Sequence, residues 1–362
     1  MIRTPQLAAK FAAQFAALFL AISLPRLARG DAPAAAADSS PRTVRRAVER
    51  AIPYLQTESA TWLAQRKCAA CHHVPMPLWA LGEAARQGYA IDRKFVAETI
   101  EAAIGGPEKM IASRLVSGPA DPPDPRPMAK GVNIGTVFMA VAARSMPSLT
   151  EGQEQSVRRI LDDVVKKQRD DGSWDFFLSR PPVNESQATD AAWIIMSLQD
   201  PARPGDKPTP DADARRAAAD KATAWLAGAE PDNRQADVLR LLVAIRAKTP
   251  RDALQPAIDR LLARQRPDGG WSQTADAASD AFATGQALYV LSVAGYTTKR
   301  ADLRRAVDYL LATQNPDGSW PMTSRSSPDG KPGGAAKLLT PITCAATSWA
   351  TLALARLEPQ RP

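Results

Sequence analysis

The sequence predicts an all-α protein in which about five helix pairs stack side by side. The 362 residues are 45% hydrophobic and 23% charged, and they are rich in alanine and poor in valine, which favours helices over strands. A turn motif also recurs along the chain, each time between two helical patterns. A helix pair of this kind cannot bury its apolar face alone, so we expect neighbouring pairs to stack.

The recurring motif is a glutamine followed six residues later by a tryptophan, with a glycine two residues before the tryptophan. Three clear copies are Gln168/Trp174, Gln265/Trp271 and Gln314/Trp320. Gln265 and Gln314 are 49 residues apart, and Gln168 and Gln265 are separated by almost two such periods. Degenerate copies occur at 222–232 and 51–56. In each copy an amphipathic helix ends in the turn, and a second apolar helix follows, expected at 132–145, 187–199, 235–247, 280–294 and 341–356.

This pattern resembles the QW repeat of squalene–hopene cyclases and of the related protein prenyltransferases. The resemblance covers residues 45–362 apart from 64–130, which we interpret as a helical insertion in the first repeat. It implies a terpenoid cyclase-like α/α toroid, in which outer helices surround an inner ring. It also implies that each glutamine and tryptophan ties adjacent helices together, a structural role. We therefore expect one domain over 43–362, with insertion helices at 79–87 and 94–104.

The N-terminus has the pattern of a secretory signal peptide over residues 1–30. Arg3 and Lys10 precede the uncharged stretch 11–24, and small residues at Ala28 and Gly30 suit a cleavage site. A disordered linker is expected over 31–42. These features predict a periplasmic or otherwise exported protein, and an uncleaved membrane anchor is the alternative.

Cys68-Ala-Ala-Cys71-His72 matches the attachment signature of c-type haem. Its two thiols would bond haem c covalently, and His72 would be the proximal iron ligand. A Cys68–Cys71 disulfide, a zinc site and an unprocessed motif are alternatives. The third cysteine, Cys344, is expected to be a buried small hydrophobe.

The residue inventory limits the ligand on the other side of the haem. His73 is the only other histidine, and it is too close to His72 in sequence to reach that side. Met128, which ends a proline-rich run, is the favoured distal ligand. Met110 and an open coordination position are alternatives.

The chemistries of the resembled families are not evident in this sequence. The cyclases protonate an alkene with a D-x-D-D motif, and the closest string here is Asp211-Ala-Asp213-Ala214. The prenyltransferases bind zinc with a histidine, and the C-terminal half of this chain has none. Asp190, Asp237 and Asp280 begin second helices at comparable places. They are either helix-stabilising acids or an acidic ring at a cavity mouth.

The sequence therefore predicts an exported c-type haem protein on a cyclase-like scaffold, acting in electron transfer or in redox or ligand binding. An enzyme or binder acting on an isoprenoid or other large apolar molecule is one alternative, and a non-catalytic helical scaffold is another. The expected partner is a redox protein or a small apolar ligand. The net charge of the chain is +8, which would allow contact with a membrane surface. The Lys and Arg residues are scattered along the sequence and do not indicate nucleic-acid binding.

Overall fold

The computed structural model describes residues 40–66, 73–104, 131–176, 179, 181–199, 211–230, 233–322, 325 and 342–359. These residues form twelve α-helices and no β-strand. They all belong to one compact unit, residues 37–362. None of the twelve helices combines the length and the apolar character needed to span a bilayer.

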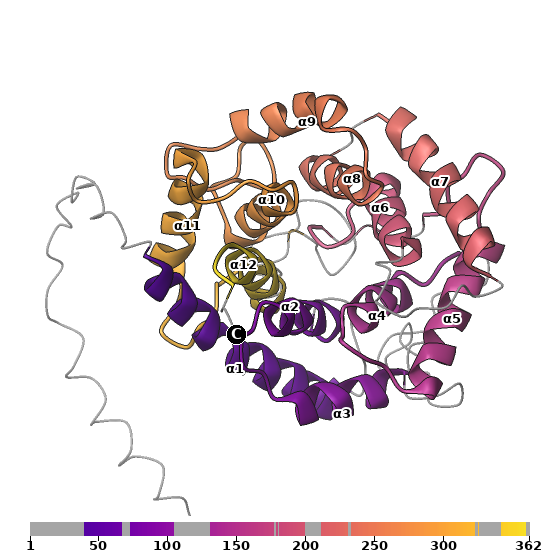
Figure 1. Ribbon diagram of the computed structural model, residues 1–362, viewed down its shortest axis with the longest axis horizontal. Coiled ribbons are helices and arrows are strands. Elements are labelled where there is room, and N and C mark those ends of the chain that lie inside the picture. Colours follow the sequence, from indigo (N-terminus) through magenta and orange to yellow (C-terminus); the bar gives the residue numbers. More distant parts are fainter. Residues whose placement is uncertain are drawn as a thin grey trace, which may run out of the picture. The chain divides into compact units, whose positions relative to one another are not determined.

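The helices of this unit alternate along the chain between an outer and an inner ring (Figure 1). The outer helices are α1 (Pro41–Arg66), α3 (Arg93–Ile104), α5 (Glu151–Lys166), α7 (Ala212–Gly228), α9 (Arg251–Ala263) and α11 (Ala301–Thr313). The inner helices are α2 (Pro75–Arg86), α4 (Ile134–Arg144), α6 (Gln187–Leu198), α8 (Arg234–Arg246), α10 (Ala281–Val293) and α12 (Thr343–Leu357). The predicted all-α toroid is therefore confirmed.

The ring has six helix pairs where the sequence predicts about five. The two helices expected inside the 64–130 insertion are present as α2 and α3, but they are members of the ring. The inner helix α2 packs against α12 and α4, and ten of its twelve residues are buried. The sequence analysis missed this pair because neither helix leads into a glutamine–tryptophan motif. The N-terminal helix begins at Pro41, two residues before the expected start of the domain.

The apolar patterns of the helices explain the two rings. The outer helix α9 buries only Leu254, Ile258 and Leu261, a single stripe at helical spacing that faces inward. The inner helix α12 buries twelve of its fifteen residues, because outer and inner neighbours surround it. The second helices expected from the sequence are confirmed as α4, α6, α8, α10 and α12, each within two residues at its start.

The three clear motifs tie neighbouring outer helices together, as the resemblance implies. The Gln265 side-chain amide donates to the backbone carbonyl of Asp302 on α11, at 2.7 Å, and to that of Gly269, at 2.8 Å. The Trp271 indole N–H donates to the Leu261 carbonyl near the end of α9, at 2.7 Å. The bonds to Gly269 and Leu261 hold the turn against the end of α9, and the bond to Asp302 ties this turn to the first turn of α11. The motifs at Gln168 and Gln314 make the equivalent bonds.

The last motif closes the ring by joining α11 to α1. Gln314 donates to the Ala47 carbonyl on α1 at 2.9 Å. Gly318 has a φ of +89°, and a Cβ atom there would lie 2.2 Å from the Arg50 carbonyl oxygen. Only glycine satisfies both the left-handed backbone and this close approach.

Aromatic side chains from five of the six inner helices pack together in the core. Trp79 of α2 makes edge-to-face contacts with Trp193 of α6, Tyr289 of α10 and Trp349 of α12, with ring centroids 5.1–5.6 Å apart. The ring centroids of Phe138 of α4 and Trp193 are 4.4 Å apart. These rings are almost completely buried. Trp193 and Trp349 therefore belong to the core, and the middle of the inner ring is packed with side chains.

Substituting Gly318 tests whether ring closure constrains the fold. Gly295 provides a matched control, because its φ is +87° but a Cβ atom there would meet nothing within 4 Å. We expect Gly295→Ala to lower the free energy of unfolding by about 1–2 kcal/mol through backbone strain alone. Gly318→Ala should cost at least about 2 kcal/mol more, because its methyl group overlaps α1. Urea unfolding of both variants measures the difference, and equal losses would show that the α1 contact is not tight.

Candidate functional site

The outer helices end at the mouth of the ring where the inner helices begin. This follows from the alternation of outer and inner helices along the chain (Figure 1). The connection between α1 and α2 contains Cys68, Cys71 and His72, and the connection between α3 and α4 contains Met110 and Met128. These five residues lie outside the described part of the chain. The ends of α1 and α3 and the starts of α2 and α4, which flank them in the sequence, belong to the described part.

The residue that follows the cysteine–histidine motif is fixed against the end of α1. His73 is buried, and its imidazole stacks on the Trp62 indole with centroids 3.7 Å apart and an interplanar angle of 9°. Its backbone carbonyl accepts a hydrogen bond from Ser59 Oγ at 2.8 Å. One face of the ring is therefore covered by Trp62.

The three candidate acids begin inner helices but do not occupy equivalent positions. Asp280 is the N-cap of α10, and its side chain accepts from the Ala283 backbone N–H at 2.8 Å. The corresponding caps of α6 and α8 are Ser186 and Asn233. Asp190 and Asp237 lie one turn inside their helices, a difference that the sequence spacing did not reveal. Asp280 therefore stabilises the start of its helix as a capping residue.

Asp237 and Asp190 have different surroundings. Asp237 forms an ion pair with Arg264 at 2.7 Å. Asp190 Oδ1 is buried, and no described residue donates a hydrogen bond to it. Burial raises the pKa of Asp190 well above its ordinary value, although a hydrogen bond with the Asn184 side chain opposes the rise. Burial likewise raises the pKa of Asp280, against the hydrogen bonds from Ala283 and Gln273.

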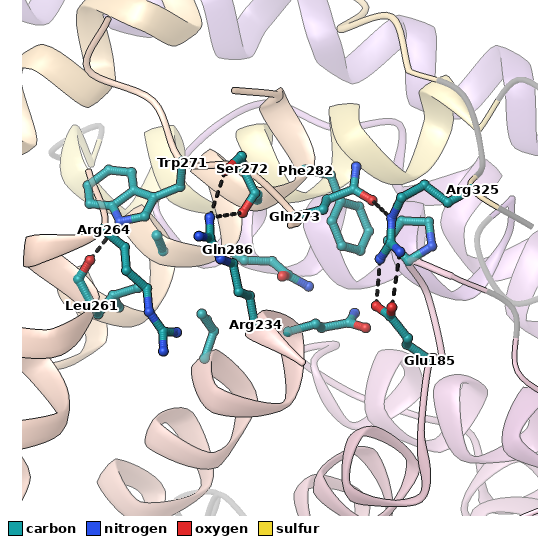
Figure 2. Close-up of a pocket in the computed structure, with 15 residues that line it drawn as sticks. Glu185, Arg234, Leu261, Arg264, Trp271, Ser272, Gln273, Phe282, Gln286 and Arg325 are labelled. Carbon is teal, nitrogen blue, oxygen red and sulfur yellow. Dashed lines mark hydrogen bonds and ion pairs between the residues drawn. The ribbon is translucent and has the colours of Figure 1, made fainter. Parts of the chain in front are cut away.

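A pocket at the same mouth contains none of these acids. It lies between α8, α10 and the end of α9 and is lined by Arg234, Gln235, Val238, Phe282 and Gln286 among others (Figure 2). The sequence analysis missed it. Arg234 follows a capping residue and resembles any solvated helix-end charge, so no local pattern indicates that it converges with α9 and α10.

The described residues hold no other site of the predicted kinds. No group of three or more His, Cys, Asp or Glu residues among them could bind a metal ion. Cys344 is a free thiol buried in α12, and burial raises its pKa. The expectation that Cys344 is a buried small hydrophobe is confirmed.

The buried carboxyl of Asp190 should make stability depend on pH. Because the native pKa is raised, ionisation costs the native state more than the unfolded state. Relative to Asp190→Asn, the wild-type protein should therefore lose stability as pH rises above about 3.8, by up to about 1.4 kcal/mol per pH unit until the native pKa is reached. Urea unfolding between pH 4 and 8 measures this difference. A difference that is flat with pH, or that favours the wild type at high pH, would contradict it.

Comparison with known proteins identifies the fold. Residues 228–360 match the family described as squalene-hopene cyclase C-terminal domain. Among solved structures, variants of the type II terpene cyclase MstE from Scytonema are similar: one with geranylgeranyl dihydroxybenzoate as substrate (15% identity, TM-score 0.51), one apo (14%, 0.52) and one with merosterolic acid A as product (13%, 0.52). Each alignment covers 88% of this chain and 98% of the other. No curated protein sequence gives a significant match. The chain has the fold of a terpenoid cyclase-like α/α toroid.

Proposed function

We propose that this chain is an exported c-type haem protein in which a packed toroid holds a haem segment at one mouth and supports electron transfer. The observation that carries the proposal is the sequence Cys68-x-x-Cys71-His72. Its donor set fits haem c, with two thiols for covalent attachment and one imidazole for the iron. Bound haem would supply reversible one-electron transfer through its iron.

The chain around the motif is suited to holding a rigid group. The helix α1 ends at Arg66, two residues before Cys68. On the other side His73 is fixed by Ser59 and Trp62, and α2 starts at Pro75 with Pro75 and Met76 buried. Both ends of a short segment are therefore attached to packed helices.

The packed interior favours a supporting role for the toroid. Trp79, Trp193 and Trp349 meet within the inner ring, so a large isoprenoid would have to displace buried indoles to enter there. Displacing them would forfeit buried apolar area and close contacts. A scaffold that carries haem chemistry at its mouth needs no such cavity. An enzyme or binder acting on a large apolar molecule is thus less well supported than the haem protein.

The signal-like residues 1–30 lie outside the described part of the chain, and export is part of the proposal. Covalent attachment of c-type haem takes place after export, so the two features support each other. The expected partner is a redox protein that exchanges electrons with the haem attached to the 67–72 connection.

The attachment site is tested by removing its thiols. The double variant Cys68→Ala/Cys71→Ala, exported in cells with haem-maturation machinery, should lose all haem staining on a denaturing gel. Cys344→Ala is the matched control and should retain full staining, because that thiol is buried in α12. Staining that survives in the double variant would refute this site.

The distal ligand is tested by the weak near-infrared band that histidine–methionine ligation gives to oxidised haem. We expect Met128→Leu to abolish the band and Met76→Leu to preserve it, because Met76 is buried in α2. Loss of the band in Met110→Leu alone would assign the ligand to Met110. A wild-type protein without the band that binds carbon monoxide when reduced has an open position, which would favour ligand binding over simple electron transfer.

A further inference from the structure

A second pocket lies at the opposite mouth of the ring, where the inner helices end. It is formed at the ends of α2, α10 and α12, and α12 packs between the other two (Figure 1). The pocket holds about 210 Å³ of space that water can occupy, whereas a single water needs only about 10–15 Å³ on this measure. A ligand of several non-hydrogen atoms therefore fits. Gln87, Tyr296, Thr297 and Arg356 are among the residues that line it.

The pocket lies where a series of bonds between inner helices is interrupted. At this mouth, polar side chains at the end of one inner helix donate to a backbone carbonyl at the end of the next. Three bonds are of this kind: Arg86 to Ser145, Arg144 to Ser197 and Gln199 to Val243. Among the described residues, the ends of α8 and α10 make no such bond to the inner helix that follows. The side chains around the end of α10 are therefore not committed to joining helices.

Arg356 is only partly neutralised. Its Nη1 lies 3.3 Å from the Glu83 carboxylate, but Glu83 also pairs with Arg86 and accepts from the Gln87 amide at 2.8 Å. One carboxylate is thus shared by two guanidinium groups. The Arg356 side chain is 33% exposed, and its buried Nε has no hydrogen-bond partner in the described part of the chain. A buried donor of this kind is normally paired, so its position in a pocket indicates an acceptor that binds there.

A third arginine adds to the positive charge beside this pocket. Burial and the charge of Glu83 raise the pKa of Tyr289, and the charges of three arginines oppose the rise. These arginines are Arg246, Arg356 and Arg86. Arg246 ends α8, and it forms neither a hydrogen bond nor an ion pair with a described residue. Three positive charges therefore surround the single carboxylate of Glu83.

The wall formed by Tyr296 does not reverse this balance. The guanidinium groups of Arg251 and Arg300 each lie 5.1 Å from the centroid of the Tyr296 ring. Arg300 is compensated, because its hydrogen bonds with Asp302 and the charge of Asp259 raise its pKa. Arg251 forms no ion pair within the described residues. The surroundings of the pocket are therefore positive on both sides.

We propose that this pocket binds an oxyanion of the phosphate class, either free phosphate or the phosphate group of a larger molecule, with Arg356 as its anchor. The planar donors of arginine suit phosphate oxygens. The Thr297 hydroxyl and the second N–H of the Gln87 amide supply further donors, since Glu83 uses only one N–H of that amide. The three donors come from different segments, so a tetrahedral group accepts from all of them, whereas a flat carboxylate occupies the arginine alone.

The helix ends around the pocket are compatible with an anion. A helix C-terminus carries a partial negative charge on its unpaired carbonyls. At the end of α10, the carbonyls of Val290, Leu291 and Ser292 already accept from backbone N–H groups of the following turn. The inference does not depend on haem and goes beyond the proposed electron transfer.

Inorganic phosphate is a suitable probe, titrated calorimetrically into the full chain at low ionic strength beside glycerol phosphate, acetate and glycerol. We expect phosphate or glycerol phosphate to bind at least about tenfold more tightly than acetate or glycerol. Tighter binding of glycerol phosphate would identify the phosphate group of a larger molecule as the ligand, and tighter binding of phosphate would identify the free ion. Acetate binding as tightly as both phosphates, or no saturable phosphate binding, would overturn the proposal.

Three variants assign the binding to the pocket. Arg356→Gln leaves Glu83 paired with Arg86 and should weaken phosphate binding at least about tenfold. Thr297→Val changes an exposed residue and should weaken it by a smaller factor. Glu83→Gln removes the shared carboxylate and should strengthen phosphate binding, an effect that a purely structural Arg356 would not produce.

Arg260→Gln is the matched control for these variants. Arg260 is exposed near the end of α9, at the other mouth of the ring, so this variant should bind phosphate as the wild type does. Circular dichroism checks that each variant is folded. An unchanged phosphate affinity in folded Arg356→Gln would refute the assignment.

Discussion

The contact between α11 and α1 determines the architecture, because it joins residues 267 positions apart in the sequence. Each helix pair buries apolar surface only against its neighbours, so an open chain of pairs would leave two apolar faces in water. The Gln314 amide and the Cβ-free Gly318 bring the last outer helix onto the first. Closure removes both exposed faces. It also gives every inner helix two inner neighbours.

Closure also explains why the interior of the ring is filled with buried side chains and why the pocket between α8, α9 and α10 lies where the inner helices begin. Six inner helices of mostly apolar residues converge, and aromatic side chains from five of them meet. The mouth at their N-termini carries the capping side chains and the pocket between α8, α9 and α10.

Local spacing was sufficient to predict most of the fold. The bonds of Gln265 and Trp271 follow from one turn motif, so a six-residue spacing identifies them. The helices α2 and α3 were predicted as helices but not as ring members, because membership depends on contacts with α12 and α5 that no local pattern encodes. The one-turn offset of Asp280 from Asp190 was also hidden, since capping depends on backbone geometry. The pocket could not be foreseen because Arg234, Leu261 and Phe282 come from three separate helices.

The central claim is that the connection between α1 and α2 carries one covalently bound haem. The most direct measurement is the intact mass of the wild-type protein, exported in cells with haem-maturation machinery and denatured before analysis. The account predicts the mass of the chain without its signal segment plus one haem, located by digestion to the peptide containing Cys68 and Cys71. A chain mass with no added haem, in a protein that is exported and folded, would contradict it.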